Sequence, residues 1–349
     1  MRLNIQRFGG DPNAITVIGE SAGAGSIVSH LTAFGGVDGT NSFQRAIIQS
    51  PAIKPAQNVA LYTHLWQDLL AVSNTSSYAE LRQLPSEDLQ AINTAMVGAA
   101  PFASSVFGNN PPLPSTRQTQ TSPLARQTNL HPGPNVDSVL ITTEPGVALS
   151  QGLVDHSVEV IVAHNSNEGL LFTDPRIANE PDFEAYLQGF MPSLPESKIQ
   201  ELAQTIYPHD FSGSALPYTT QVDRTKLAIA EGLVGCFAFG VALAYGNATR
   251  GYQWGVFPGI HAGDVAYTFF NGVLEGGLGG PVVVEAAEKM QRWFVDFAMK
   301  GAESGSAAAE LPVYGADASV VDVSGTGFAV VRDPAANARC RFWLEGLTA

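Results

Sequence analysis

The feature that most constrains this chain is a serine between two glycines, at the point where a β-branched run gives way to small residues. Residues 15–31 read ITVIGESAGAGSIVSHL. The Gly-x-Ser-x-Gly pattern is weak by itself, because 35 of the 349 residues are glycine. Its context is more specific, since a strand before and a helix after hold the serine in a strained turn with its hydroxyl outward. The stretch therefore predicts a reactive serine, Ser21, at the end of a buried strand.

Further short apolar runs follow at residues 45–50, 158–163 and 252–257, separated by helical patterns. Strands that alternate with helices predict an α/β fold with a mostly parallel central sheet and flanking helices. Helices are expected within residues 56–96 and at 285–301, where Met290, Trp293, Phe294 and Phe297 have the spacing of a core-facing stripe. Residues 101–134, rich in Pro, Ser, Thr, Asn and Gln, predict a long surface connection. We expect one domain over residues 1–349, with a helical, cap-like insertion at 175–246.

A serine nucleophile needs a histidine to take its proton and an acid to orient that histidine. His261 is the best placed histidine because it lies in a loop directly after the predicted strand 252–257, and His164, which also ends a strand, is the closest rival. Glu168 lies just beyond the strand 158–163, where catalytic groups of an open α/β sheet collect. Asp155 and Asp174 are the alternatives for the acid, one before this strand and one farther along the loop.

The composition excludes some classes of protein. With 18 Lys and Arg against 32 Asp and Glu, the net charge of −14 disfavours a nucleic-acid partner. Residues 227–245 form the longest apolar segment, but Glu231 and several glycines favour a core helix over a membrane span. No metal-ligand spacing or phosphate-cradling glycine loop occurs, so neither a metal nor a cofactor is expected.

Two cysteines and two glycosylation sequons bear on the cellular compartment. From their spacing, Cys236 and Cys340 leave a long-range disulfide and two buried free thiols equally open. The sequons at Asn74 and Asn247 favour a secretory route, although such triplets also arise by chance. The segment MRLNIQRFGG lacks the uninterrupted apolar core expected of a signal peptide.

Several segments together resemble one family. NIQRFGGDPNAITVIGESAGAGSI, NEGLLF and PGIHAGDVAYTFFNG are similar to the type-B carboxylesterase and lipase family, the cholinesterase-like branch of the α/β-hydrolases. MQRWFVDFAMKG and LPVYG are similar to the C-terminal region of that family, and GNATRGYQWGVFP and RCRFW are similar to its secreted fungal members. The resemblance covers nearly the whole chain and thins between residues 50 and 134.

The resemblance implies a role for each site residue. Ser21 would be the nucleophile, His261 the general base and then acid, and Glu168 the acid of the triad, in the order of the α/β-hydrolases. The backbone N–H of Ala22 would stabilise the oxyanion, and Glu20 would act on the histidine through its field or else be a buried structural carboxylate. The implied substrate is a small-molecule or lipid ester, and the implied parent protein is extracellular.

The resemblance also predicts what should precede residue 15. In the family a glycine-rich loop before the serine completes the oxyanion hole, and none is found upstream here, so the chain resembles the C-terminal part of a longer esterase. This predicts low activity and an exposed sheet edge. Three functions are therefore weighed: a serine ester hydrolase, a catalytically inert fragment of one, and a cholinesterase-like adhesion or binding module, which would need no triad.

Overall fold

The computed structural model describes residues 1–55, 59–99, 135–275 and 280–347. The predicted connection at 101–134 lies outside this range. The chain forms two compact units. The first holds Met1–Pro55, Asp137–Leu171 and Ala228–Ala349, and the second holds Ala56–Val136 and Phe172–Leu227.

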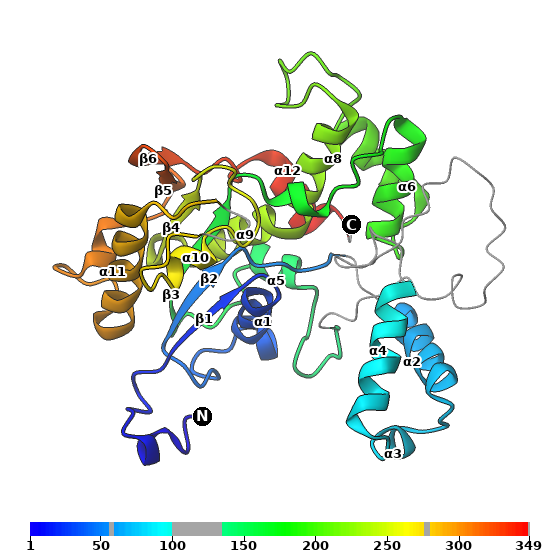
Figure 1. Cartoon of the computed structure of the whole chain (residues 1–349), viewed down its shortest axis with the longest axis horizontal. Coiled ribbons are helices and arrows are strands. Elements are labelled where there is room, and N and C mark those ends of the chain that lie inside the picture. The colour runs from blue at the N-terminus through cyan, green and yellow to red at the C-terminus, as the bar shows by residue number, and fades with distance from the viewer. Residues whose placement is uncertain (56–58, 100–134, 276–279, 348–349) are drawn as a thin grey trace. The chain divides into compact units, whose positions relative to one another are not determined.

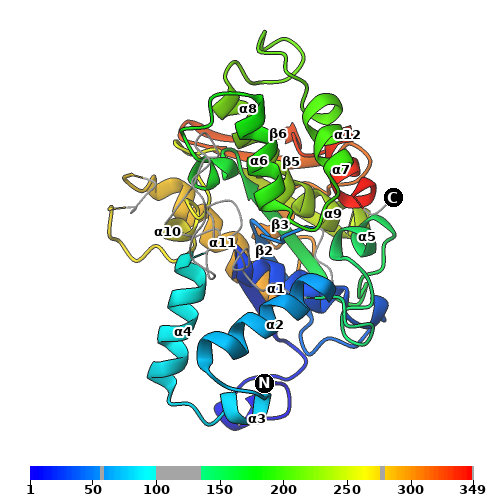
Figure 2. The same cartoon turned by 90° about the vertical axis from the view of Figure 1, so that its right-hand side faces the viewer.

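The first unit contains a six-stranded sheet (Figure 1). The strands follow one another in chain order: β1 Thr16–Glu20, β2 Arg45–Gln49, β3 Glu159–Asn165, β4 Thr249–Trp254, β5 Ser319–Ser324 and β6 Gly327–Arg332. Strands β1 to β5 are parallel, and β6 returns antiparallel to β5 as a hairpin, drawn in orange-red in Figure 2. The α/β class and the first four strands were predicted correctly from the alternation of apolar runs with helices.

Helices cover both faces of this sheet, as its apolar strands require. They are α1 Ala22–Leu31, α5 Pro145–Ser150, α9 Cys236–Tyr245, α10 Val265–Thr268, α11 Val284–Lys300 and α12 Ala338–Arg341. Short 3-10 or π turns lie at Ile5–Phe8, Ala33–Gly35, Glu168–Phe172, Glu231–Gly235, Gly246–Ala248, Ala307–Glu310 and Phe342–Gly346. Figure 1 shows α11 on one side of the sheet and α1 and α9 on the other.

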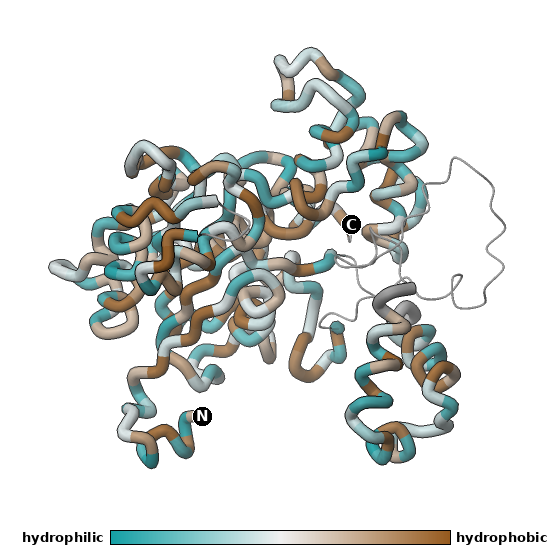
Figure 3. Tube along the Cα trace, viewed as in Figure 1, coloured by the Kyte–Doolittle hydropathy of each residue, from teal (hydrophilic) through white to brown (hydrophobic). Residues whose placement is uncertain are grey.

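The largest core lies between α11 and the sheet. Met290, Trp293, Phe294 and Phe297 on α11 are at most 6% exposed and belong to one cluster with Ile161 of β3. Val160 and Val162, the neighbours of Ile161 on β3, point to the opposite face of the sheet and are also buried. The prediction that the aromatic stripe of residues 285–301 is core packing is confirmed. Figure 3 shows brown, apolar segments along these strands.

The second unit is helical. Its helices are α2 Val59–Ser73, α3 Tyr78–Leu81, α4 Ser86–Ala99, α6 Glu180–Phe190, α7 Glu196–Glu201 and α8 Gln221–Ala230, with a π turn at Leu202–Ile206. Helices α6 and α8 lie side by side (Figures 1 and 2), joined by Arg224, whose guanidinium donates to Glu180 Oε1 over 3.0 Å. The predicted insertion 175–246 is helical, and the division between the units falls inside it at Leu227.

Among the residues that the structure describes, one helix, Gln221–Ala248, is long and apolar enough to be a candidate membrane span. Inside the fold, 78% of its most apolar window is buried. Helix α9 within it packs on β3 and β4. Its apolarity is therefore accounted for by core packing, as its length and sequence predicted.

Candidate active site

Ser21 occupies a sharp turn between β1 and α1. Its backbone has φ 57° and ψ −121°, a left-handed conformation that a residue with a Cβ rarely adopts. Its N–H donates to the carbonyl of Gln49 over 3.0 Å, and its carbonyl accepts from Gly25 at 2.9 Å and Ala52 at 3.0 Å. The neighbouring strand β2 and the first turn of α1 therefore hold the strained residue in place.

The glycines of the motif have different importance. A Cβ at Gly19 would lie 2.6 Å from the backbone carbon of Gly23, so the strand and the helix can approach this closely only with glycine at position 19. A Cβ at Gly23 would meet nothing within 4 Å. The tight turn thus needs glycine at position 19, whereas position 23 has room for a small side chain.

The structure brings the three predicted residues Ser21, His261 and Glu168 together. His261 Nε2 lies 2.7 Å from Ser21 Oγ, and His261 Nδ1 lies 2.5 Å from Glu168 Oε2. Each residue follows the carboxyl end of a parallel strand, β1, β3 or β4, which explains how positions 240 residues apart meet at one edge of the sheet. His261 is 5% exposed and Glu168 is 2% exposed.

Hydrogen bonds between two loops hold the acid and the base. The Asn165 N–H donates to Glu168 Oε1 over 2.6 Å, and the Asn165 side-chain amide donates to the carbonyl of Ile260 over 2.6 Å. The Asn167 N–H donates to the carbonyl of Gly259 over 2.8 Å. The loop after β3 is therefore joined directly to the loop that carries His261.

Glu20 is a second carboxylate beside the histidine. Its Oε1 lies 3.2 Å from His261 Nε2, the same nitrogen that faces Ser21. Burial raises the pKa of Glu20 to about 7, an effect that the positive charge of His261 opposes and that Asp264 and Glu168 reinforce. Glu20 therefore gains its charge near neutral pH, directly next to the imidazole.

The acids around His261 also act on its pKa. Burial lowers this pKa, but the hydrogen bond and charge of Glu168, together with the charges of Glu20 and Asp264, outweigh it and leave the pKa above its ordinary value. An imidazole with a raised pKa accepts a proton readily. This arrangement suits a group that must remove a proton from a hydroxyl.

A buried polar network lies next to this site and was not indicated by any sequence motif. The Gln49 amide nitrogen lies 2.9 Å from Tyr252 Oη, from Asp264 Oδ2 and from Thr268 Oγ1. Tyr252 also donates to Asp264 Oδ2 over 2.9 Å. Burial raises the pKa of Asp264. Asp264 comes three residues after His261, but no expectation was drawn from this spacing.

The rival residues have other partners. His164 Nε2 lies 2.9 Å from Asp333 Oδ1, and the Asp155 carboxylate accepts from the backbone of Gly39 and from the side chain of Asn41. Asp174 forms an ion pair with Arg176 at 2.7 Å, in the second unit. The structure therefore favours His261 and Glu168 over their sequence-level alternatives.

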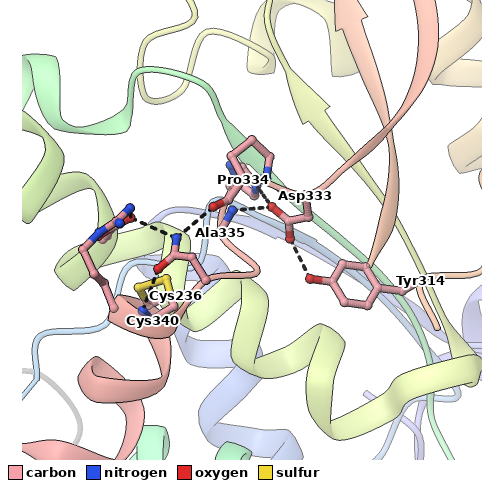
Figure 4. Close-up of a disulfide and its surroundings, with 10 residues drawn as sticks. Cys236, Tyr314, Asp333, Pro334, Ala335 and Cys340 are labelled. Carbon is pink, nitrogen blue, oxygen red and sulfur yellow. Dashed lines mark hydrogen bonds and ion pairs between the residues drawn. A yellow bond between two sulfur atoms is a disulfide. The ribbon is translucent and has the colours of Figure 1, made fainter. Parts of the chain in front are cut away.

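The remaining predicted positions are placed as follows. Cys236 and Cys340 form a disulfide that joins α9 to α12 across 104 positions of sequence (Figure 4). Ala22 is the first residue of α1, and Asn74 and Asn247 are exposed. In the described part of the chain, no group of three or more His, Cys, Asp or Glu side chains could hold a metal ion.

The fold and the sequence can now be compared with known proteins. The crystal structure of Aspergillus niger EstA matches 98% of this chain and 66% of its own length, with a TM-score of 0.73 and 21% identity. Together with the parallel sheet and the serine turn, this likeness places the chain in the α/β-hydrolase fold. A model of the carboxylesterase family matches residues 1–231, and the chain belongs to this family.

Fungal relatives agree with this assignment. Carboxylesterase patB of Aspergillus clavatus is 31% identical over 99% of this chain and 57% of its own length. Secreted lipase 1 of Botryotinia fuckeliana is 27% identical over 62% of this chain and 35% of its own length. The chain thus spans a little over half the length of the curated relatives that it matches along nearly its whole sequence. The resemblance to fungal carboxylesterases is confirmed.

Proposed function

We propose that this protein hydrolyses carboxylic esters through an acyl-enzyme intermediate on Ser21. The observation that carries the proposal is the continuous chain of short contacts from Ser21 Oγ through His261 to the buried Glu168 carboxylate. Membership of the carboxylesterase family supports ester hydrolysis in general. The geometry of Ser21, His261 and Glu168 supports the specific mechanism proposed below.

In the first half-reaction, Ser21 Oγ attacks the ester carbonyl carbon while His261 Nε2 accepts the hydroxyl proton. The Glu168 carboxylate keeps the Nδ1 proton of His261 in place and stabilises the imidazolium that forms. The tetrahedral intermediate then collapses. The alkoxide leaving group takes the proton from Nε2 and departs as the alcohol, which leaves an acyl group on Ser21.

In the second half-reaction, His261 Nε2 takes a proton from water, and the resulting hydroxide attacks the acyl carbon. The second tetrahedral intermediate collapses as Ser21 regains its proton from His261, and the carboxylic acid is released. Each carbonyl oxygen that becomes negative needs donors. The backbone N–H of Ala22, at the start of α1, is the donor that we assign to this oxyanion.

The proposed substrates are uncharged small-molecule or lipid esters. Three carboxylates act on His261, from Glu168, Glu20 and Asp264, and they disfavour an anionic group near the nucleophile. The disulfide and the exposed sequons Asn74 and Asn247 support an extracellular parent protein, as does the name of the secreted lipase relative. The largely helical insertion at residues 175–246 is proposed to be cap-like.

The test is hydrolysis of p-nitrophenyl butyrate by the 349-residue chain and by Ser21→Ala, with light scattering to show that both are monodisperse. Ser21→Ala removes only one oxygen, which makes it a close structural match. The proposal predicts turnover that this substitution abolishes. Equal background rates from two folded, monodisperse proteins would contradict it and favour the inert or binding alternatives.

A further inference from the structure

A second histidine–carboxylate pair is buried next to the site and has no part in the proposed reaction. His164 Nε2 lies 2.9 Å from Asp333 Oδ1, and their side chains are 9% and 3% exposed. Tyr314 donates its hydroxyl to Asp333 Oδ2 over 2.8 Å, and the Ala335 N–H donates to Oδ1 over 2.8 Å. Removing two charges from water is costly, so a buried pair of this kind contributes little stability by itself.

The pair is connected to both the acid and the base of the site through one residue. His164 is followed by Asn165, whose carbonyl lies 3.3 Å from His164 Nδ1. Asn165 donates its N–H to Glu168 and its side-chain amide to the carbonyl of Ile260, the residue before His261. Any shift of Asn165 would therefore displace Glu168 and His261 together.

The pair also places a positive charge near Glu168. Burial lowers the pKa of His164, but the charge and hydrogen bond of Asp333 and the charge of Glu168 raise it to about 9. His164 is therefore cationic at neutral pH. Glu168 also interacts with the negative groups Glu20 and Asp264 and with the phenol of Tyr252, so His164 offsets a concentration of negative charge.

We propose that His164 is a positioning residue for ester hydrolysis: held by Asp333 and Tyr314, it fixes Asn165, which in turn holds Glu168 and the loop that carries His261. This inference rests on the function proposed above. Figure 4 shows that Asp333 belongs to the segment that leads through Ala335 to the Cys236–Cys340 disulfide. The disulfide-bonded C-terminal segment therefore supplies a residue on which the geometry of the site depends.

The decisive variant is the double substitution His164→Gln with Asp333→Asn. The two amides can keep a hydrogen bond between them while both charges are removed. The proposal predicts that kcat falls about 10- to 100-fold while KM stays within about twofold, because the acid and base are displaced but substrate contacts are not.

A matched control is His156→Gln, the same substitution at an exposed histidine of the first unit, which should leave kcat unchanged. Tyr314→Phe is a milder variant that removes only the hydroxyl donated to Asp333. If circular dichroism shows that the double variant does not fold, Tyr314→Phe is used instead to test the positioning role. It should lower kcat at least twofold while KM stays within about twofold. A purely structural pair would lower the melting temperature and leave kcat of the folded protein unchanged, which would overturn the proposal.

A spectroscopic readout separates this proposal from the proposed function. The proton in the 2.5 Å contact between His261 Nδ1 and Glu168 should give a far-downfield proton resonance, which can be followed without substrate in a Ser21→Ala background. The proposal predicts that this resonance moves or broadens in the double variant and not in His156→Gln. An unchanged resonance would refute the positioning role even if hydrolysis is observed. If the resonance changes but the chain with Ser21 intact shows no hydrolysis, the positioning role is supported and only the enzyme assignment is refuted.

Discussion

Glu20 provides a prediction whose magnitude follows from the structure. Its side chain is 21% exposed, and burial raises its pKa from 4.5 to about 7. Between these two pH values, the folded protein keeps a proton on Glu20 that the unfolded chain has already released. The free energy of unfolding therefore falls as the pH rises through this range, by about 3 kcal/mol at most. Solvent screening of a partly exposed group lowers the expected value to about 2 kcal/mol.

The substitution Glu20→Gln should remove this loss of stability. Glutamine has nearly the shape of protonated glutamate and cannot ionise, so at pH 4.5 the variant and the wild type should be almost equally stable. At pH 8 the variant should be more stable by about 2 kcal/mol. The same change removes a negative charge next to His261, so the acid limb of kcat/KM should move to lower pH.

The assay is urea unfolding at pH 4.5 and pH 8, followed by the fluorescence of the buried tryptophans of the first unit. Glu303→Gln is the control for the loss of one carboxylate, because Glu303 is exposed. Its difference from wild type should stay within about 0.5 kcal/mol at both pH values. If the stability difference between Glu20→Gln and wild type were the same at both pH values, our account of a buried, proton-retaining Glu20 would be wrong.

Four other variants test the packing that supports the site. Gly19→Ala should lower stability by about 1–3 kcal/mol and reduce hydrolysis, because its Cβ would lie 2.6 Å from the Gly23 backbone; Gly23→Ala, with open space around its Cβ, should keep the wild-type melting temperature. Replacing Cys236 and Cys340 together by serine should cost about 2–4 kcal/mol in urea unfolding, because the bond closes a loop of 104 positions. Trp293→Ala should cost about 3–5 kcal/mol by the same measurement, since this side chain is 1% exposed in the core beneath α11. An unfolding curve like that of the wild type would contradict the disulfide if the variant without Cys236 and Cys340 gave it, and the core position of Trp293 if Trp293→Ala gave it.

The parts of the fold that were predictable are those with a local signal. The serine turn has its own pattern of β-branched, glycine and small residues, and α11 has an aromatic stripe at helical spacing. Strands β5 and β6 were not predicted. Residues 327–332 contain four consecutive apolar residues but no strict alternation of apolar and polar ones, and all six are partly exposed or exposed in this edge strand.

The candidate site was predictable residue by residue but not as a network. Ser21, Glu168 and His261 each follow a recognisable strand, so the rule that ligands collect at the carboxyl ends of strands selects them. The contact of His164 with Asp333 spans 169 positions, and that of Gln49 with Asp264 spans 215. No local pattern specifies such pairs, because they depend on tertiary packing. The pairing of Cys236 with Cys340 likewise depends on tertiary packing, so the spacing of the two cysteines in the sequence could not decide between a disulfide and two free thiols.

The central claim is that Ser21 is an activated nucleophile, and covalent labelling tests it most directly. The folded, monodisperse chain is incubated with an alkyl fluorophosphonate, and the intact mass and the modified peptide are determined by mass spectrometry. We predict one adduct per chain, located on Ser21, and strongly slowed labelling in His261→Ala, which lacks the base 2.7 Å from the hydroxyl. A folded protein that forms no adduct, or that is labelled on another residue, would contradict the proposed mechanism.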